Sequence, residues 1–235
     1  MACSNGDVGE VSKRRRFYTA AEVALHNCAK DCWVSVFGKV LDLTPLLTAV
    51  EPESDDSALI VPIEAHAGKD VSHWFDKDTH DVKRALDETT GLVLPVLPHG
   101  RFLHVAPSEP VSNWSTDFAE PWWRDMDTYC IGSLSDSVRR VCIVNMLTYQ
   151  ETILEVCEEE TMREIEDRYL DWNAHSQSYT WKVLDGDVFR PLDMDLSLTE
   201  NGVEDETPLF DKYSIPRDAF IPTIHAYFND DLTTA

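Results

Sequence analysis

Apolar and polar positions along the chain predict two successive groups of helices and strands. Near the N-terminus, Thr19 and Glu22 have the spacing of a capping box, which predicts a helix that begins near Ala20. The aromatic and β-branched run at 33–37 predicts a strand, because such side chains suit a pleated, half-buried surface. After a tight turn, the apolar pair at 40–41 predicts a second, returning strand.

The next part of the chain carries three regularly spaced histidines. Its expected elements are a short apolar strand or packed segment, an interrupted helical segment and a strand, at residues 59–63, 64–87 and 101–105. His66, His73 and His80 recur every seven residues, so a continuous helix would place them near one face. This spacing makes them the first candidates for a binding site.

A second group of elements is predicted from residue 137 onward. It consists of a strand pair, a helix that begins after the capping-box pair Thr161 and Glu164, further strands and a final strand at 221–228. This order is typical of a β-grasp, ubiquitin-like fold, in which the final strand lies centrally, beside and parallel to the first. The chain has no C-terminal Gly-Gly, so we expect an interaction or packing module and no protein modifier.

The charge of the chain is strongly acidic. Its 235 residues include 43 acidic and 20 basic side chains, which leaves a net charge of -23. Such a charge disfavours general binding to nucleic acids or anionic membranes, and it favours solubility and encounters with basic partners.

Several further classes of protein are disfavoured by the sequence. No apolar run approaches the length of a membrane span, so no membrane insertion is expected. The six cysteines show no disulfide framework, which predicts reduced, intracellular thiols. No nucleophile–base constellation, phosphate-binding loop or nicotinamide fingerprint is present, so we expect no enzyme.

The first group of elements resembles the cytochrome b5-like haem-binding fold. The residues that carry this resemblance occur in the family's order: Tyr18 to Glu22, His26-Asn27, Trp33, Val40 to Thr44 and Ala67 to Asp70. The family places its first iron ligand in a His-Pro-Gly-Gly turn, but that position falls on Val50 here. The second ligand position falls on His80.

The resemblance therefore implies haem binding that is weak or redox-conditional. His73 or His80 would contact the iron, and the second axial site would be filled from elsewhere or left open. Because axial ligands approach a haem from opposite sides, a partner from another segment, such as His104 or His26, would complete a six-coordinate site. The competing interpretation of His73 is a hydrogen-bonded, partly buried histidine packed against Trp74, and base rates favour it.

Nearly the whole chain resembles the cytochrome b5 domain-containing protein 1 family. The segments that carry this wider resemblance lie at 67–76, 100–105, 121–123, 178–182 and 227–232. The resemblance implies a structural or regulatory component of the ciliary or flagellar axoneme, associated with radial spokes and required for ciliary motility. Axonemal and radial-spoke proteins would be its partners, in the cytoplasm and cytoskeleton of the cilium. The alternative is a soluble haem-based redox sensor or electron carrier.

The sequence thus predicts an α+β protein with two domains. The expected segments are a disordered tail, a cytochrome b5-like domain, a Pro/Trp-rich connector and a ubiquitin-like β-grasp domain, at residues 1–16, 17–106, 107–136 and 137–232. Within the connector, Trp114, Trp122 and Trp123 would act either as glue between the domains, the favoured interpretation, or as a hot spot for a partner.

Overall fold

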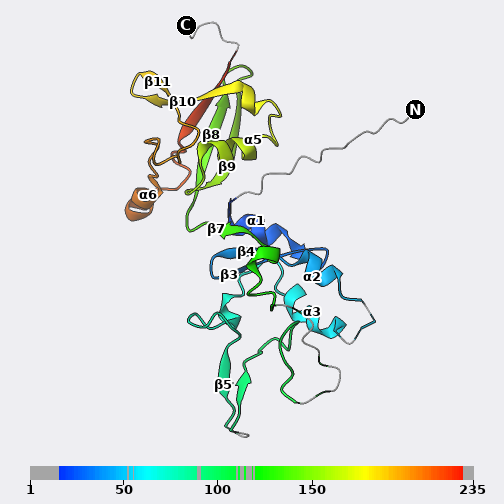
Figure 1. Cartoon of the computed structure of the whole chain (residues 1–235). Coiled ribbons are helices and arrows are strands. Elements are labelled where there is room, and N and C mark those ends of the chain that lie inside the picture. The colour runs from blue at the N-terminus through cyan, green and yellow to red at the C-terminus, as the bar shows by residue number, and fades with distance from the viewer. Residues whose placement is uncertain are drawn as a thin grey trace, which may run out of the picture.

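The computed structural model arranges the chain in two lobes (Figure 1). It describes residues 16–229, except for 52, 55, 89, 90, 110, 112, 113, 115–117 and 119. The expected tail at 1–16 therefore lies almost wholly outside the described residues. One lobe contains the elements from β1 to β7, and the other contains those from β8 to β12.

The first lobe is built on a five-stranded sheet with the strand order β1-β7-β4-β3-β2. These strands are β1 (Phe17–Tyr18), β2 (Asn27–Cys28), β3 (Asp31–Val36), β4 (Lys39–Asp42) and β7 (Cys130–Leu134). The strand pair predicted around residue 38 is confirmed, since β3 and β4 pair antiparallel. Strand β7 arrives from the end of the expected connector and pairs parallel with β1 and antiparallel with β4.

Short helices and one hairpin complete this lobe. They are α1 (Ala20–Leu25), α2 (Thr44–Thr48), α3 (Ser57–Glu64), the 3₁₀ helix η1 (Ser72–Trp74), the hairpin β5 (Arg84–Leu86) and β6 (Val93–Pro95), and α4 (Met126–Tyr129). The predicted capping box is confirmed: Glu22 N–H donates to the Thr19 hydroxyl at 3.1 Å, and Thr19 N–H donates to the Glu22 carboxylate at 2.8 Å.

Two local predictions in this lobe are wrong, and a third is right in only one of its alternatives. The apolar run at 59–63 is a packed segment and no strand: it lies in helix α3, where Leu59 and Ile63 are buried four residues apart. A short apolar run alone cannot distinguish a strand from a buried helix. The segment 64–87 is mainly turns, because Gly68 adopts a φ of 78° that ends the helical path. Residues 101–105 form a turn and no strand, with His104 at a φ of 70°.

The second lobe contains a five-stranded sheet with the order β11-β10-β12-β8-β9. Its strands are β8 (Val138–Asn145), β9 (Gln150–Cys157), β10 (Tyr179–Asp185), β11 (Val188–Pro191) and β12 (Thr223–Phe228), and its helices are α5 (Met162–Tyr169), η2 (Ser176–Ser178) and α6 (Thr207–Tyr213). The final strand β12 is central and runs parallel to β8, as predicted. The capping box of Thr161 and Glu164 at the start of α5 is also confirmed.

Each lobe has its own apolar core. Helix α5 places Met162, Ile165 and Tyr169 on the second sheet, together with Val141 and Ile143 of β8. The core of the first lobe is formed by both sheet and helices, and it includes Trp122 and Trp123 from the expected connector. Among the described residues, no helix is long and apolar enough to cross a bilayer.

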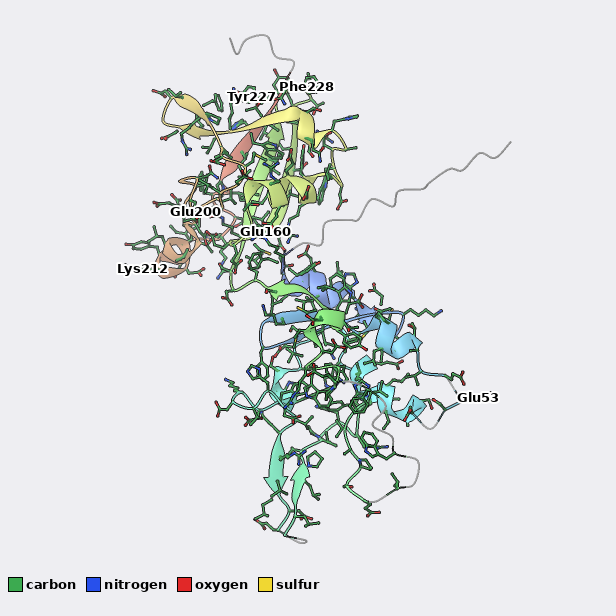
Figure 2. The ribbon with its side chains drawn as sticks, in the orientation of Figure 1. Glu53, Glu160, Glu200, Lys212, Tyr227 and Phe228 are labelled. Atoms are coloured by element: carbon green, nitrogen blue, oxygen red, sulfur yellow. The ribbon has the colours of Figure 1, made fainter. Side chains whose placement is uncertain are left out.

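Charged side chains join the two lobes. Arg168 of α5 donates from Nη2 to the Glu22 carboxylate of α1 at 3.1 Å, and its Nη1 makes a second bond to the same carboxylate. Arg168 Nε also donates at 2.8 Å to both oxygens of Glu160, which lies at the base of the second lobe (Figure 2). Nearby, Arg16 donates two hydrogen bonds to the Glu164 carboxylate, from Nε at 2.6 Å and from Nη2 at 2.9 Å.

Candidate functional site

The position of the family's first iron ligand is occupied by an apolar side chain. Val50 follows helix α2 and packs, partly buried, against the core of the first lobe. Its side chain carries no atom that can ligate a metal. One of the two axial contacts of the usual haem site is therefore missing.

The position of the second ligand lies on the surface. His80 is exposed, has a φ of 53° and stacks on Phe37 with a ring-centroid distance of 5.0 Å. Phe37 in turn contacts Phe75 edge to face, at 6.5 Å between centroids. His80 therefore packs on the outer side of Phe37, at the surface of the lobe. Its ring is not part of the buried core.

His73 lies in a different group of histidines. Its ring centroid is 6.3 Å from that of His66 and 6.2 Å from that of His99, while His66 and His99 are 4.3 Å apart. The ring contact of His73 with Trp74, at 6.1 Å, agrees with the predicted packing, but the predicted partial burial is wrong, because the His73 side chain is exposed. The shared helix face predicted for His66, His73 and His80 is wrong, because η1 is the only helical element within 66–80 and it is three residues long.

The histidine group does not form a metal centre as it stands. His66 Nδ1 lies 2.8 Å from the Pro62 carbonyl oxygen, which can only accept, so this nitrogen donates and is unavailable as a ligand. Among the described residues, no group of three or more His, Cys, Asp or Glu side chains is arranged to hold a metal ion.

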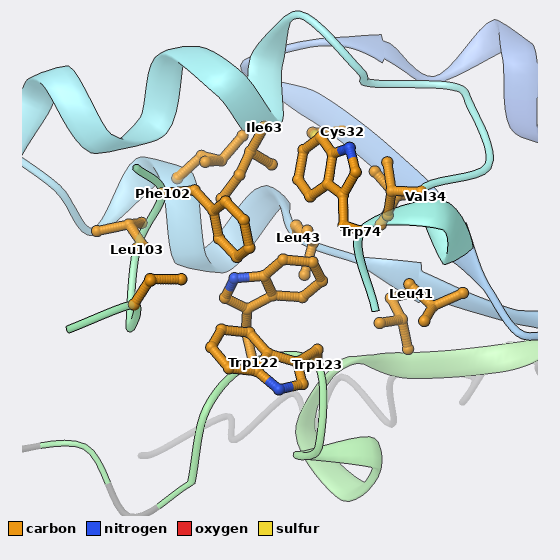
Figure 3. Close-up of a cluster of buried hydrophobic side chains, with 14 of the residues drawn as sticks. Cys32, Val34, Leu41, Leu43, Ile63, Trp74, Phe102, Leu103, Trp122 and Trp123 are labelled. Atoms are coloured by element: carbon orange, nitrogen blue, oxygen red, sulfur yellow. The ribbon is translucent and has the colours of Figure 1, made fainter. Parts of the chain in front are cut away.

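Five aromatic side chains lie in the core of the first lobe, and Figure 3 labels all of them except Phe75. They are Trp74, Phe75, Phe102, Trp122 and Trp123. Phe75 lies 5.7 Å from the Trp122 ring and 5.6 Å from the Trp123 ring, and the two tryptophans cross at 90° with centroids 5.5 Å apart. Trp122 is 0% exposed and Trp123 is 5% exposed. The interpretation of these two side chains as a partner hot spot is therefore wrong, because both are buried in the core. Their favoured interpretation as glue between the domains is wrong as well, since they pack inside the first lobe and not between the lobes.

A histidine fixes the Trp122 segment in place. The backbone N–H of Trp122 donates to His104 Nδ1 at 3.0 Å, and the His104 ring stacks on Phe118 with centroids 4.1 Å apart. Burial lowers the pKa of His104, which favours the neutral ring that this bond requires. Sequence reasoning missed this role. The only available signal was a lone histidine close to a proline- and tryptophan-rich segment.

The residues present do not fit a haem enclosed between two histidines. A porphyrin needs a flat apolar slot with a donor on each side, yet the walls supplied by α2, α3, η1 and the sheet already enclose Trp122 and Trp123. The indole N–H groups of Trp74, Trp122 and Trp123 are buried and lack hydrogen-bond partners among the described residues. Aromatic rings thus occupy this core, and the three unpaired indole N–H groups lower its contribution to stability.

Two buried cysteines, Cys32 and Cys157, do not supply reactive thiolates. Burial raises the pKa of Cys32 and of Cys157 to about 12, so both thiols stay protonated near neutral pH. All five described cysteines are free. Cys3 lies outside the described residues.

Comparison with known proteins identifies the family. Residues 19–135 match the family model described as the cytochrome b5-like heme/steroid binding domain. A cytochrome b5 domain-containing protein 1 of Xenopus tropicalis is 51% identical over 220 residues, which cover 94% of this chain and 97% of the relative. The chain belongs to the cytochrome b5 domain-containing protein 1 family. The human member is 46% identical and covers 94% of this chain and 92% of its own length.

Family membership associates the first lobe with a haem-binding domain family. A cytochrome b5 of Borago officinalis is 40% identical over only 75 residues, which are 31% of this chain and 52% of that protein. A solved cytochrome b558 of Ectothiorhodospira vacuolata, titled a prokaryotic homologue of cytochrome b5, is 22% identical and covers 29% of this chain and 78% of its own. Its TM-score of 0.21 carries no further structural inference.

Proposed function

We propose that this chain is a structural or regulatory component of the ciliary axoneme, associated with radial spokes and required for motility. The observation that carries the proposal is the filled core: Trp122 and Trp123 are buried in the apolar core of the first lobe, together with side chains of its helices and its sheet. A domain that replaces its cofactor slot with its own side chains retains the rigidity of the fold without the redox chemistry. The ciliary setting rests on the resemblance to the family as a whole.

The second lobe is proposed to be a separate, ubiquitin-like β-grasp domain. Its hairpin β8–β9, helix α5 and strands β10 and β11 precede a last strand, β12, that inserts centrally beside β8. This connection order supports the assignment. The proposed domains lie at 17–106 and 137–232, with 107–136 between them. The end of this middle segment belongs to the first lobe, because Trp122 and Trp123 lie in its core, β7 lies in its sheet, and the family model matches up to residue 135.

Haem binding is proposed to be weak and secondary. The exposed positions of His73 and His80 allow an iron contact at the rim of the aromatic core, with the second axial position open or filled from elsewhere. The exposed side chains of His73 and His99, which lie beside His66, are the observation that favours the alternative function, a haem-based redox sensor. An electron carrier is disfavoured, because it must hold its haem firmly in both redox states.

Fractionation of cilia tests the structural proposal. After detergent has removed membrane and matrix, the protein is expected to remain with the microtubules and to leave only at high salt or under stronger extraction. Release of the whole pool with the detergent-soluble matrix would refute the axonemal role and favour the redox sensor or carrier.

A further inference from the structure

A groove between the two lobes combines exposed apolar side chains with a free sheet edge. It has a volume of about 330 Å³ and is lined by residues of α1, β9, α5 and the turn after α5, among them Leu25, Ile153, Glu155, Asp171 and Trp172. Leu25 is 76% exposed, Ile153 55% and Trp172 56%. Apolar side chains from three different elements thus gather at one opening.

The free edge belongs to strand β9. In the second sheet β9 is the terminal strand, and its only neighbour is β8 (Figure 1). The N–H of Glu158 donates to Ser137 O, which fixes the alternation: every second residue of β9, counted back from Cys157, directs its backbone groups away from β8. These residues are Glu151, Ile153 and Glu155. Within the described chain their outward backbone groups have no hydrogen-bond partner.

The two ends of this edge differ. Near the end of β9, the N–H of Cys157 is already taken by the Glu160 carboxylate at 2.9 Å, which in turn is held by Arg168. An added strand therefore cannot pair with Cys157, because the Glu160 carboxylate, held by Arg168, already accepts from its N–H. The available edge is the stretch 151–155, which is long enough for a short added strand.

The side chains on this stretch define the partner. Glu151, Ile153 and Glu155 are all exposed and, at alternate positions, share one face of the strand. Residues directly opposite one another in paired strands interact, and opposite charges stabilise the pair. A complementary strand therefore presents a basic residue at each end and an apolar residue between them. Glu155 lies opposite Arg140 of β8 and lines the groove together with Asp171, while Glu151 lies opposite the uncharged Val144, so each end of the stretch carries a carboxylate.

We infer that β9 docks an extended segment of a partner protein with the alternating pattern basic–any–apolar–any–basic, added as a further strand at the edge 151–155. The central apolar side chain contacts Ile153, while Leu25 and Trp172 cover the remainder of the segment in the groove. A second copy of this chain is a poor occupant, because its own β9 would place glutamate opposite glutamate. The inference deepens the proposed role as a structural or regulatory component, on which it rests, by giving the chemistry of one partner.

Peptide binding to the full chain tests this inference. The probe is a fluorescein-labelled peptide containing Lys-Thr-Val-Thr-Lys, and the matched peptide contains Glu-Thr-Val-Thr-Glu. Fluorescence anisotropy is expected to show at least about tenfold tighter binding of the basic peptide, with the difference shrinking as salt is added. Hydrogen exchange is expected to slow at the amides of Glu151, Ile153 and Glu155, whose N–H groups would become paired.

Two variants distinguish binding at the β9 edge from a general effect of added positive charge. Ile153→Lys on β9 is expected to weaken binding of the basic peptide at least about tenfold. Val188→Lys is its matched control, because Val188 is an exposed apolar residue (68%) on β11, the opposite edge of the same sheet, and this variant is expected to bind as the wild type does. The pair Glu151→Lys and Glu155→Lys is expected to reverse the preference in favour of the acidic peptide.

Three outcomes would overturn the inference: equal affinity for the two peptides, equal effects of Ile153→Lys and Val188→Lys, or concentration-dependent dimers that Ile153→Lys abolishes. The last would assign the edge to a second copy of the chain. Because these measurements use the isolated protein, they can succeed or fail independently of the ciliary fractionation.

Discussion

Arg168 in the second lobe and Glu22 in the first form a bidentate ion pair across the junction of the lobes. Glu22 at the same time completes the capping box of α1, and Arg168 also neutralises Glu160, which is 1% exposed. One arginine therefore links the start of a helix in one lobe to a buried carboxylate in the other.

Removal of this arginine is expected to be costly. Arg168→Met leaves Glu160 buried without its cation, and the loss of one partner of a buried pair typically costs about 3–5 kcal/mol in the free energy of unfolding. Urea denaturation at neutral pH measures this cost. The control is Arg163→Met on the same helix: its pair with Asp195 is exposed, so we expect a change below about 1 kcal/mol. Similar losses in the two variants would contradict the role of Arg168.

The bond between His104 and Trp122 predicts a loss of stability in mild acid. Because burial lowers the pKa of His104 in the folded state, its contribution is complete above about pH 6.5, the ordinary value of histidine. As the pH falls below that value, the unfolded chain takes up the proton first, and stability declines until the folded pKa is passed. Protonated Nδ1 can no longer accept from Trp122 N–H.

His104→Asn separates this effect from general acid sensitivity. The asparagine side chain can still accept a hydrogen bond but does not titrate in this range. The difference in unfolding free energy between about pH 7.5 and pH 5 is expected to be smaller in the variant than in the wild type. An unchanged difference would show that His104 does not control the acid response.

The tryptophan core predicts a contrast between two substitutions. Trp122→Ala should cost about 3–5 kcal/mol, since it removes a fully buried ring and leaves a cavity. Trp122→Phe should cost clearly less, because it keeps an aromatic ring and removes an indole N–H that has no partner among the described residues. Thermal or urea unfolding gives both values. Equal costs would mean that the indole N–H does find a partner.

Haem titration tests the closed core. Addition of hemin to the wild type is expected to give a weak Soret shift without the sharp spectrum of a bis-histidine haem. The double variant His73→Ala and His80→Ala should abolish this weak signal. Val50→His restores a ligand at the first position, yet it should not produce a bis-histidine spectrum, because Trp122 and Trp123 still fill the core. A bis-histidine spectrum in the wild type or in Val50→His would show that the core opens.

The elements with strong local signals could be predicted from the sequence. Both capping boxes, at Thr19 and Thr161, begin helices within one residue of the expected position, since the residues that form the cap also define the pattern. The central place of β12 followed from the order of the elements. These features depend on neighbours in the chain or on general rules of connection.

The features that sequence reasoning missed depend on contacts between distant segments. Nothing near His104 indicates that it accepts a bond from residue 122, and nothing near Arg168 indicates a carboxylate 146 positions earlier. The histidine spacing was misleading for the same reason. Gly68, with a φ of 78°, packs closely against Ala24 and turns the chain before a long helix can form.

The placement of β7 has a consequence for folding during synthesis. The sheet of the first lobe closes only when residues 130–134 insert between β1 and β4, more than a hundred positions after β1. During synthesis the edges of β1 and β4 stay unpaired until the intervening chain has left the ribosome. Unpaired strand edges can pair with other chains and promote aggregation. A chain that ends at residue 106 lacks β7, so its first sheet would keep these unpaired edges. The aromatic segment at 121–123 and the strand that follows it are thus the closing step in the folding of the first lobe.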